Sequence, residues 1–285
     1  MIMLKRLRTA HPIRYCVLSE VLFLGVMMLA SFLILVVILA MQLDVNRVED
    51  YFVSALQELV GLLTAVFLLK RTGKGELLRR RGCGFFNGLL VGMYPLLQLA
   101  LSLYSRLMLL PEGSLLPAWR IGCFFGNMIL VGVAEEVLFR GVMAQTLLEH
   151  FGTGRAGVWK ACLLSGVLFG AAHLSNLIGS APLGVLMQCV FAASLGTLYT
   201  AVYYRTGNLW VTAFLHAGMD ITSMLAGGLY GTQSVAESIS GYDLSMLTSV
   251  FIYLIPTVFL LRKKKIGEVA LYFGRDCRPQ PVNEG

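Results

Sequence analysis

The amino-acid sequence predicts an all-α membrane protein, a polytopic bundle of about eight transmembrane helices. Of its 285 residues, 57% are hydrophobic and only 14% are charged, whereas roughly a quarter of the residues in a soluble domain are charged. The apolar residues form blocks of about 18 residues or more, which is the length needed to cross a bilayer. Lys and Arg gather in alternate connections between these blocks. We therefore predict a single integral membrane domain over residues 1–285.

The first four predicted spans are separated by connections of alternating charge. The first block, 16–43, follows a basic segment, and it is too long and too continuous for a signal peptide. An acidic connection leads to the second block, 51–69, and a strongly basic connection leads on to the third, 84–110. The fourth block, 119–148, follows a connection that contains Glu112. The two basic segments contain Lys5, Arg6, Arg8, Arg14, Lys70, Arg71, Lys74, Arg79, Arg80 and Arg81.

The last four predicted spans continue the alternation. They occupy 158–178, 183–204, 209–229 and 245–261. Basic residues lie before the fifth span and after the sixth and eighth, whereas the connection after the seventh contains Glu237 and Asp243 and no Lys or Arg. Eight spans then place both termini in the cytoplasm. Because the net charge of +7 arises mainly in these connections, it indicates membrane topology and not binding of nucleic acid.

Nine ionisable side chains within the predicted spans are candidates for a functional role, because each costs about 2.5–3.5 kcal/mol to place near the bilayer centre. Glu20, Glu58 and Arg106 lie near span ends, and we interpret them as interfacial charges. The other six cluster on the fourth, fifth and seventh spans and are expected to face the interior of the bundle. They are Glu135, Glu136, Arg140, His173, His216 and Asp220.

Helical spacing sorts these residues into faces. Glu136 and Arg140 are four residues apart, so they share a face and can form an ion pair. Glu135 is rotated from that pair by about 100°, which leaves it for another role. The alternative is that both glutamates only brace Arg140 against neighbouring helices. Two further pairs share a face at the same spacing: Phe169 with His173, and His216 with Asp220.

Glycine pairs on the fourth and fifth spans predict that these two helices approach each other closely. The pairs are Gly122–Gly126 and Gly166–Gly170, each of the small-xxx-small type.

These residue types are suited to hydrolysis by an activated water. A carboxylate and an imidazole that converge on one water can remove its proton, and a second imidazole can stabilise the oxyanion that forms when the water attacks an amide. One Glu and two His are equally a zinc ligand set with an open position for water. The sequence contains no HExxH motif, which would indicate a metalloprotease, and no GxSxG motif, which would indicate a serine nucleophile. Water activation with or without a metal therefore remains open.

Three motifs resemble those of a known family. Glu135-Glu136-Val-Leu-Phe-Arg140, Phe169-Gly-Ala-Ala-His173 and His216-Ala-Gly-Met-Asp220 are similar to the EExxxR, FxxxH and HxxxN/D series of the CAAX-protease and bacteriocin-processing (Abi) family. These are intramembrane endopeptidases related to type II CAAX prenyl proteases. The resemblance implies an eight-helix fold, with a motif-bearing protease core over residues 117–229.

The resemblance also implies roles for the motif residues. Glu135 and His173 would activate the attacking water, and His216 and Asp220 would stabilise the oxyanion. Glu136, Arg140 and Phe169 would support the site. If metal is bound, Glu135, His173 and His216 would hold zinc. Asp220 stands where eukaryotic-type members tend to have Asn. An ionised Asp would repel an oxyanion, so Asp220 would have to be protonated, pair with His216 or serve as a metal ligand. This departure weakens the oxyanion role and slightly favours metal binding.

We therefore expect an intramembrane endopeptidase that cleaves a membrane-associated peptide or protein. We expect it as a multi-pass protein of the bacterial plasma membrane, where many relatives act without prenylated substrates. One alternative is a non-catalytic membrane regulator, or a bacteriocin-immunity partner of a sensor kinase or toxin. A proton-coupled transporter is another, which the absence of a visible inverted repeat disfavours. The sequence specifies neither the substrate nor an oligomeric state.

Overall fold

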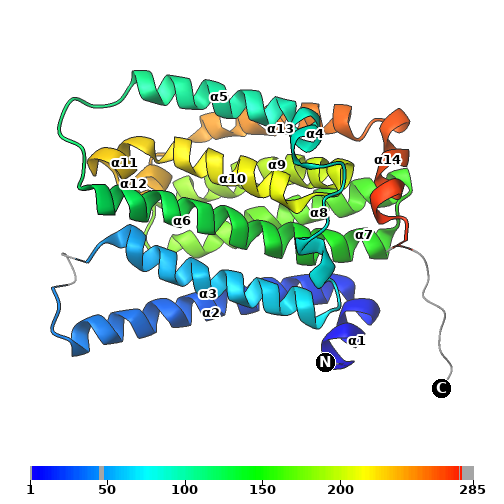
Figure 1. Ribbon diagram of the computed structural model, residues 1–285, viewed down its shortest axis with the longest axis horizontal. Helices are drawn as coiled ribbons and strands as arrows, with labels where there is room; N and C mark the ends of the chain where they lie inside the picture. The colour runs from blue at the N-terminus through cyan, green and yellow to red at the C-terminus, as the bar shows by residue number, and fades with distance from the viewer. Residues whose placement is uncertain (1, 45–47, 276, 278–285) are drawn as a thin grey trace.

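Long helices run back and forth along one axis of the molecule (Figure 1). The computed structural model describes residues 2–44, 48–275 and 277. Within these ranges the regular structure is helical and contains no strand, which confirms the predicted all-α class. The longest helices are α2 (Pro12–Ala40), α3 (Asp50–Arg71) and α9 (Pro182–Thr206).

Every predicted span corresponds to helix, although several are divided. The fourth is α6 (Ala118–Glu136), the π-helical η3 (Val137–Ala144) and α7 (Gln145–Phe151) in succession. The fifth is α8 (Arg155–Ala172) followed by the 3₁₀ turn η4 (His173–Leu177). The remaining elements are α1 (Ile2–Ala10), η2 (Gly75–Leu78), α4 (Phe85–Val91), α5 (Met93–Met108), α10 (Leu209–Ser223), α11 (Leu225–Tyr230), α12 (Val235–Ser240), η5 (Leu244–Leu247), α13 (Thr248–Leu260) and α14 (Lys263–Phe273).

Five helical stretches in the described part of the chain are long and apolar enough to cross a membrane. Two bent pairs, α4 with α5 at 85° and the stretch Leu244–Leu260 with α14 at 76°, bring the number to as many as seven. The predicted segment 209–229 divides into α10 and α11, and α10 has only 15 residues. At 1.5 Å per residue such a helix is roughly 22 Å long, shorter than the hydrocarbon core of about 30 Å.

Local sequence signals set several helix ends. Pro182 begins α9, and Gly207 ends it in the left-handed conformation with φ of 61°, which glycine adopts without steric cost. Ser234 caps α12 in a capping box with Glu237. Hydrogen bonds from the backbone N–H and hydroxyl of Ser234 hold the pKa of the Glu237 carboxyl below its ordinary value.

The stretch from α6 through α7 forms the centre of the bundle. Helices α3 and α10 pack against α6, and α8 and α3 pack against η3. All eight residues of η3 are buried. By contrast, α2 exposes many large apolar side chains on its outer face, including Leu22, Leu29 and Phe32, as expected of a surface that faces lipid acyl chains.

The glycine pairs act differently from the prediction. A Cβ on Gly166 would lie 2.6 Å from the Ala193 carbonyl oxygen, and one on Gly170 would lie 2.5 Å from that of Cys189. These glycines therefore allow α8 to approach α9 and not the fourth span. A Cβ on Gly122 or Gly126 would meet nothing within 4 Å, so the predicted contact between these pairs is wrong. A small-xxx-small motif indicates close packing without identifying the partner helix.

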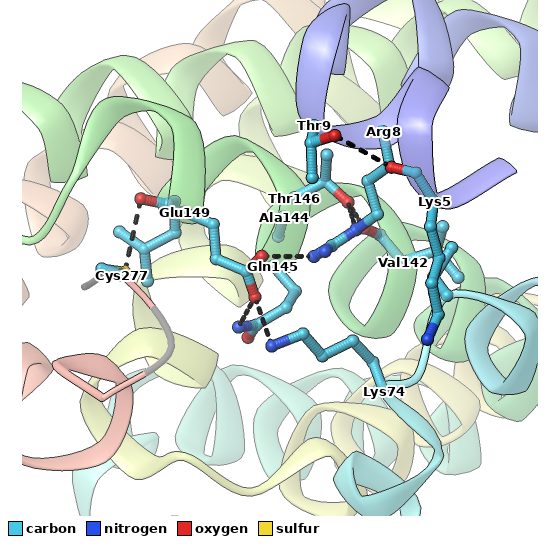
Figure 2. Close-up of polar contacts among 12 residues, drawn as sticks. Lys5, Arg8, Thr9, Lys74, Val142, Ala144, Gln145, Thr146, Glu149 and Cys277 are labelled. Atoms are coloured by element: carbon cyan, nitrogen blue, oxygen red, sulfur yellow. Dashed lines mark hydrogen bonds and ion pairs between the residues drawn. The ribbon is translucent and has the colours of Figure 1, made fainter. Parts of the chain in front are cut away.

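An ionic cluster joins the N-terminus to the end of α7. Figure 2 shows Arg8 and Lys74 converging on Glu149, at distances of 2.7 and 2.8 Å. Gln145 also donates to Glu149, and the Arg8 Nε atom donates to the Thr146 hydroxyl. Because Arg8 lies on α1 and Lys74 follows α3, this cluster fastens both segments to α7 at one end of the bundle.

Candidate active site

The three motifs converge on the imidazole of His216. Its Nδ1 atom lies 3.0 Å from Glu136 Oε1. Its Nε2 atom lies 3.6 Å from Glu135 Oε2 and 3.6 Å from Asp220 Oδ2. The ring of Phe169 contacts the rings of both His173 and His216 edge-on, with centroids 5.2 and 5.5 Å apart. Helices α6, α8 and α10 thus bring the residues of all three motifs together.

Glu136 and Arg140 form the ion pair that their spacing predicts, with Arg140 Nη1 3.0 Å from Glu136 Oε1. Both side chains are 0% exposed. The guanidinium also lies over the rings of Phe169 and Tyr199, at 4.8 and 5.6 Å, and donates to the Gly196 carbonyl oxygen. Since Oε1 of Glu136 contacts both Arg140 and His216, this glutamate links the buried ion pair to the site.

The two adjacent glutamates differ in their access to the solvent side of the site. The Glu135 side chain is 22% exposed and that of Asp220 is 27% exposed, whereas Glu136 is completely buried. A water molecule can therefore reach Glu135 but not Glu136. This separation follows from the helical rotation between consecutive residues.

His173 lies at the end of α8, where the helix passes into η4. Its Nδ1 atom is 2.9 Å from the Phe169 carbonyl oxygen. A carbonyl oxygen only accepts hydrogen bonds, so Nδ1 bears the proton and donates it in this contact. In the neutral ring Nε2 is then the basic nitrogen. The hydrogen bond thus fixes which atom of His173 can take a proton.

Glu135, His173, His216 and Asp220 line one cavity of about 380 Å³. Phe169 contributes to its wall, and further lining residues come from α2, α3, α9 and α12. The cavity therefore extends well beyond the three motif helices.

Two buried polar residues of this wall were not predicted as site residues. Glu58 on α3 is 9% exposed, and Asn127 on α6 is 2% exposed; both line the cavity.

The prediction that Glu20 and Glu58 are interfacial charges is wrong, because both are buried. Glu20 does not contribute to the described cavity wall, whereas Arg106 is exposed as predicted. The signal for Glu58 was a carboxylate inside an apolar helix, which by default indicates function.

A metal ion would need several ligands from this arrangement. Within the described ranges, no group of three or more His, Cys, Asp or Glu side chains is arranged to hold one. Glu135, His173 and His216 thus line the same cavity without forming such a three-ligand set.

The family comparison agrees with this geometry. The family described as type II CAAX prenyl endopeptidase Rce1-like matches residues 117–222. This segment, which is less than half of the 285 residues, is similar to the Rce1-like family. It contains all three motifs, from Glu135 to Asp220, while α2, α3 and the elements after α10 lie outside it. No curated protein and no solved structure matches the chain.

The similarity to the Rce1-like family supports protease activity, because that family is described as type II CAAX prenyl endopeptidase. The apolar helices are consistent with a membrane-embedded protein. Glu58 lies outside the matched segment, and its position in the cavity wall is a feature of this chain's own structure.

Proposed function

We propose that this protein is an intramembrane endopeptidase that hydrolyses a peptide bond of a membrane-associated peptide or protein. The proposal is supported chiefly by one observation: Glu135, His173, His216 and Asp220, from three separate helices, line a single cavity. Ionisable groups inside membrane helices usually serve a function because their burial is costly. The proposed location is the plasma membrane of a bacterial cell.

In the proposed reaction Glu135 and His173 activate a water molecule. Glu135 accepts a proton from the water as its oxygen attacks the carbonyl carbon of the scissile bond. The basic Nε2 atom of His173 orients the same water. When the C–N bond breaks, Glu135 returns the proton to the leaving amine, so the products are a new carboxyl terminus and a new amino terminus.

His216 is proposed to stabilise the oxyanion of the tetrahedral intermediate. Glu136 accepts a hydrogen bond from Nδ1 and thereby orients the ring, with Nε2 toward Glu135 and Asp220. When Nε2 is protonated, it can donate a hydrogen bond to the developing negative charge. Asp220 does not contact the oxyanion in this mechanism; it helps to hold His216 in place.

The experiment is cleavage of N-acetylated amphipathic peptides by the purified protein in liposomes, with products identified by mass spectrometry. We expect Glu135→Gln to reduce cleavage at least about a hundredfold, because a general base contributes 10²–10⁴ to the rate. Glu20→Gln is the matched control, since Glu20 is buried outside the cavity wall. Equal size-exclusion profiles and unfolding temperatures exclude misfolding. Full activity of a folded Glu135→Gln variant would contradict the proposal and favour the non-catalytic alternative.

A further inference from the structure

The cavity has a second polar region apart from the catalytic groups. Ser54 and Glu58 contribute to it from α3, and Asn127 contributes from α6 about two turns before Glu135. The proposed mechanism uses none of these three residues.

Two buried acceptor atoms in this region have no hydrogen-bond partner among the described residues. They are Oε2 of Glu58 and Oδ1 of Asn127. An unsatisfied buried acceptor destabilises a fold, and buried polar groups nearly always have partners. Both side chains are more than nine-tenths buried, and both line the cavity. A ligand that supplies hydrogen-bond donors would satisfy both atoms.

The charge of the cavity indicates which donor would bind. Glu58, Glu135 and Asp220 line it, and no Lys or Arg appears among the described lining residues. An acidic region with unused acceptors favours a cation that brings several N–H donors, as ammonium and guanidinium groups do.

The apolar wall indicates that this cation is at the end of a long side chain. Phe23, Leu24 and Met27 of α2 line the cavity together with Glu58. Lys and Arg side chains lay their methylene stems along apolar surface and place the charged group in a polar environment. A wall with three apolar side chains beside a carboxylate suits both parts of such a side chain.

We propose that Glu58 and Asn127 form a subsite that binds the basic side chain of a Lys or Arg residue in the substrate peptide, within the cavity that contains the catalytic groups. This proposal rests on the proposed endopeptidase function, which it extends to substrate selection. Glu58 is a specificity-determining residue and takes no part in the chemical step.

A binding measurement tests the subsite without any cleavage. The probes are dodecylammonium and dodecanol, which share an alkyl chain and differ in charge, titrated into the purified full-length protein in detergent. We expect the wild type to bind dodecylammonium at least tenfold more tightly than dodecanol, and Glu58→Gln to reduce that ratio below threefold. Glu20→Gln, which alters a buried carboxyl away from the cavity wall, should keep the wild-type ratio. An unchanged ratio in Glu58→Gln would overturn the proposal.

Cleavage of matched peptides tests the role in specificity. Each peptide contains either one Lys or, at the same position, its uncharged analogue norleucine. The N-terminus is acetylated, so the two peptides differ only in the positive charge of the Lys side chain. We expect kcat/KM of the wild type to favour Lys at one position. Glu58→Gln should lower that preference at least tenfold through KM and leave cleavage of the norleucine peptide within about threefold. Asn127→Leu should lower the preference in the same direction.

The outcomes separate the two proposals. Cleavage that depends on Glu135 but shows the same Lys preference in wild type and Glu58→Gln would overturn the subsite and leave the endopeptidase standing. Loss of cleavage of both peptides in a folded Glu58→Gln variant would place Glu58 in the chemistry and also overturn the subsite. If the wild type cleaves nothing, the endopeptidase proposal fails, and the alkylammonium titration still decides whether the cation subsite exists.

Discussion

At the scale of single residues, Arg140 connects the stability of the fold to the geometry of the site. Its guanidinium is enclosed by Glu136, Phe169, Tyr199 and the backbone of α9. A buried ion pair adds little net stability over an apolar pair, but removing one partner leaves an uncompensated charge. Because Glu136 also binds His216, loss of Arg140 would disturb the orientation of a proposed catalytic group.

We expect Arg140→Met to lower the free energy of unfolding by about 3–5 kcal/mol, the usual cost of breaking a buried ion pair. The measurement is denaturant-induced unfolding in detergent, followed by circular dichroism. The double variant Glu136→Gln/Arg140→Met should recover part of this loss because it removes both charges. A loss below about 1 kcal/mol in the single variant would show that the pair is not isolated from solvent.

The side-chain contacts that could be predicted from the sequence are those between residues within one helical turn of each other. The Glu136–Arg140 pair and the shared face of Phe169 and His173 follow from helical spacing alone. Helical spacing also places His216 and Asp220 on one face, and they lie 3.6 Å apart. Contacts between helices do not follow from spacing: the nearest carboxylate to His216 is Glu136 on another helix. The burial of Glu58 depends in the same way on how α3 packs against α6.

At the scale of elements, the chain passes into a π-helix immediately after the adjacent glutamates. The segment Val137–Ala144 is π-helical and completely buried, and such segments often occur at functional sites. Periodicity in the sequence did not predict it, because an apolar segment buried on all sides has no amphipathic pattern from which the helix period could be determined. The packing of η3 against α3 and α8 instead defines its environment.

The close contact between α8 and α9 depends on two glycines. We expect Gly166→Ala and Gly170→Ala each to destabilise the protein by about 1–3 kcal/mol, because the added methyl group would overlap the α9 backbone. Activity should fall as well, since His173 follows Gly170 by one turn. Unfolding temperature and peptide cleavage measure the two effects.

Gly126→Ala is the matched control, because a methyl group there would meet nothing within 4 Å. It should be neutral or slightly stabilising, since Ala favours helix over Gly by up to about 1 kcal/mol. Equal effects at Gly126 and Gly170 would show that the contact between α8 and α9 is looser than the structure indicates.

At the scale of the whole molecule, the two ends of the bundle differ in charge. The α1 and α14 helices and the connections from α3 to α4 and from α7 to α8 lie at the same end (Figure 1). These segments contain Lys5, Arg6, Arg8, Lys74, Arg79, Arg80, Arg81, Lys263, Lys264 and Lys265, and Lys70, Arg71, Arg155 and Arg262 directly adjoin them. The connections from α2 to α3, from α5 to α6 and from α11 to α12 lie at the opposite end. The helix order thus follows the alternation of charge in the sequence, although helix length alone gives five to seven spans and not eight.

This asymmetry predicts the orientation of the protein in the membrane. In a background that lacks the six native cysteines, we expect a membrane-impermeant maleimide to label Thr232→Cys in intact cells. Gly154→Cys should be labelled only after the cells are made permeable, because Arg155 and Lys160 follow it in the first turns of α8, whereas the acidic residues Glu237 and Asp243 follow Thr232. Both positions are exposed. The reverse labelling pattern would invert the topology, and labelling of both in intact cells would place both ends of the bundle on the same side.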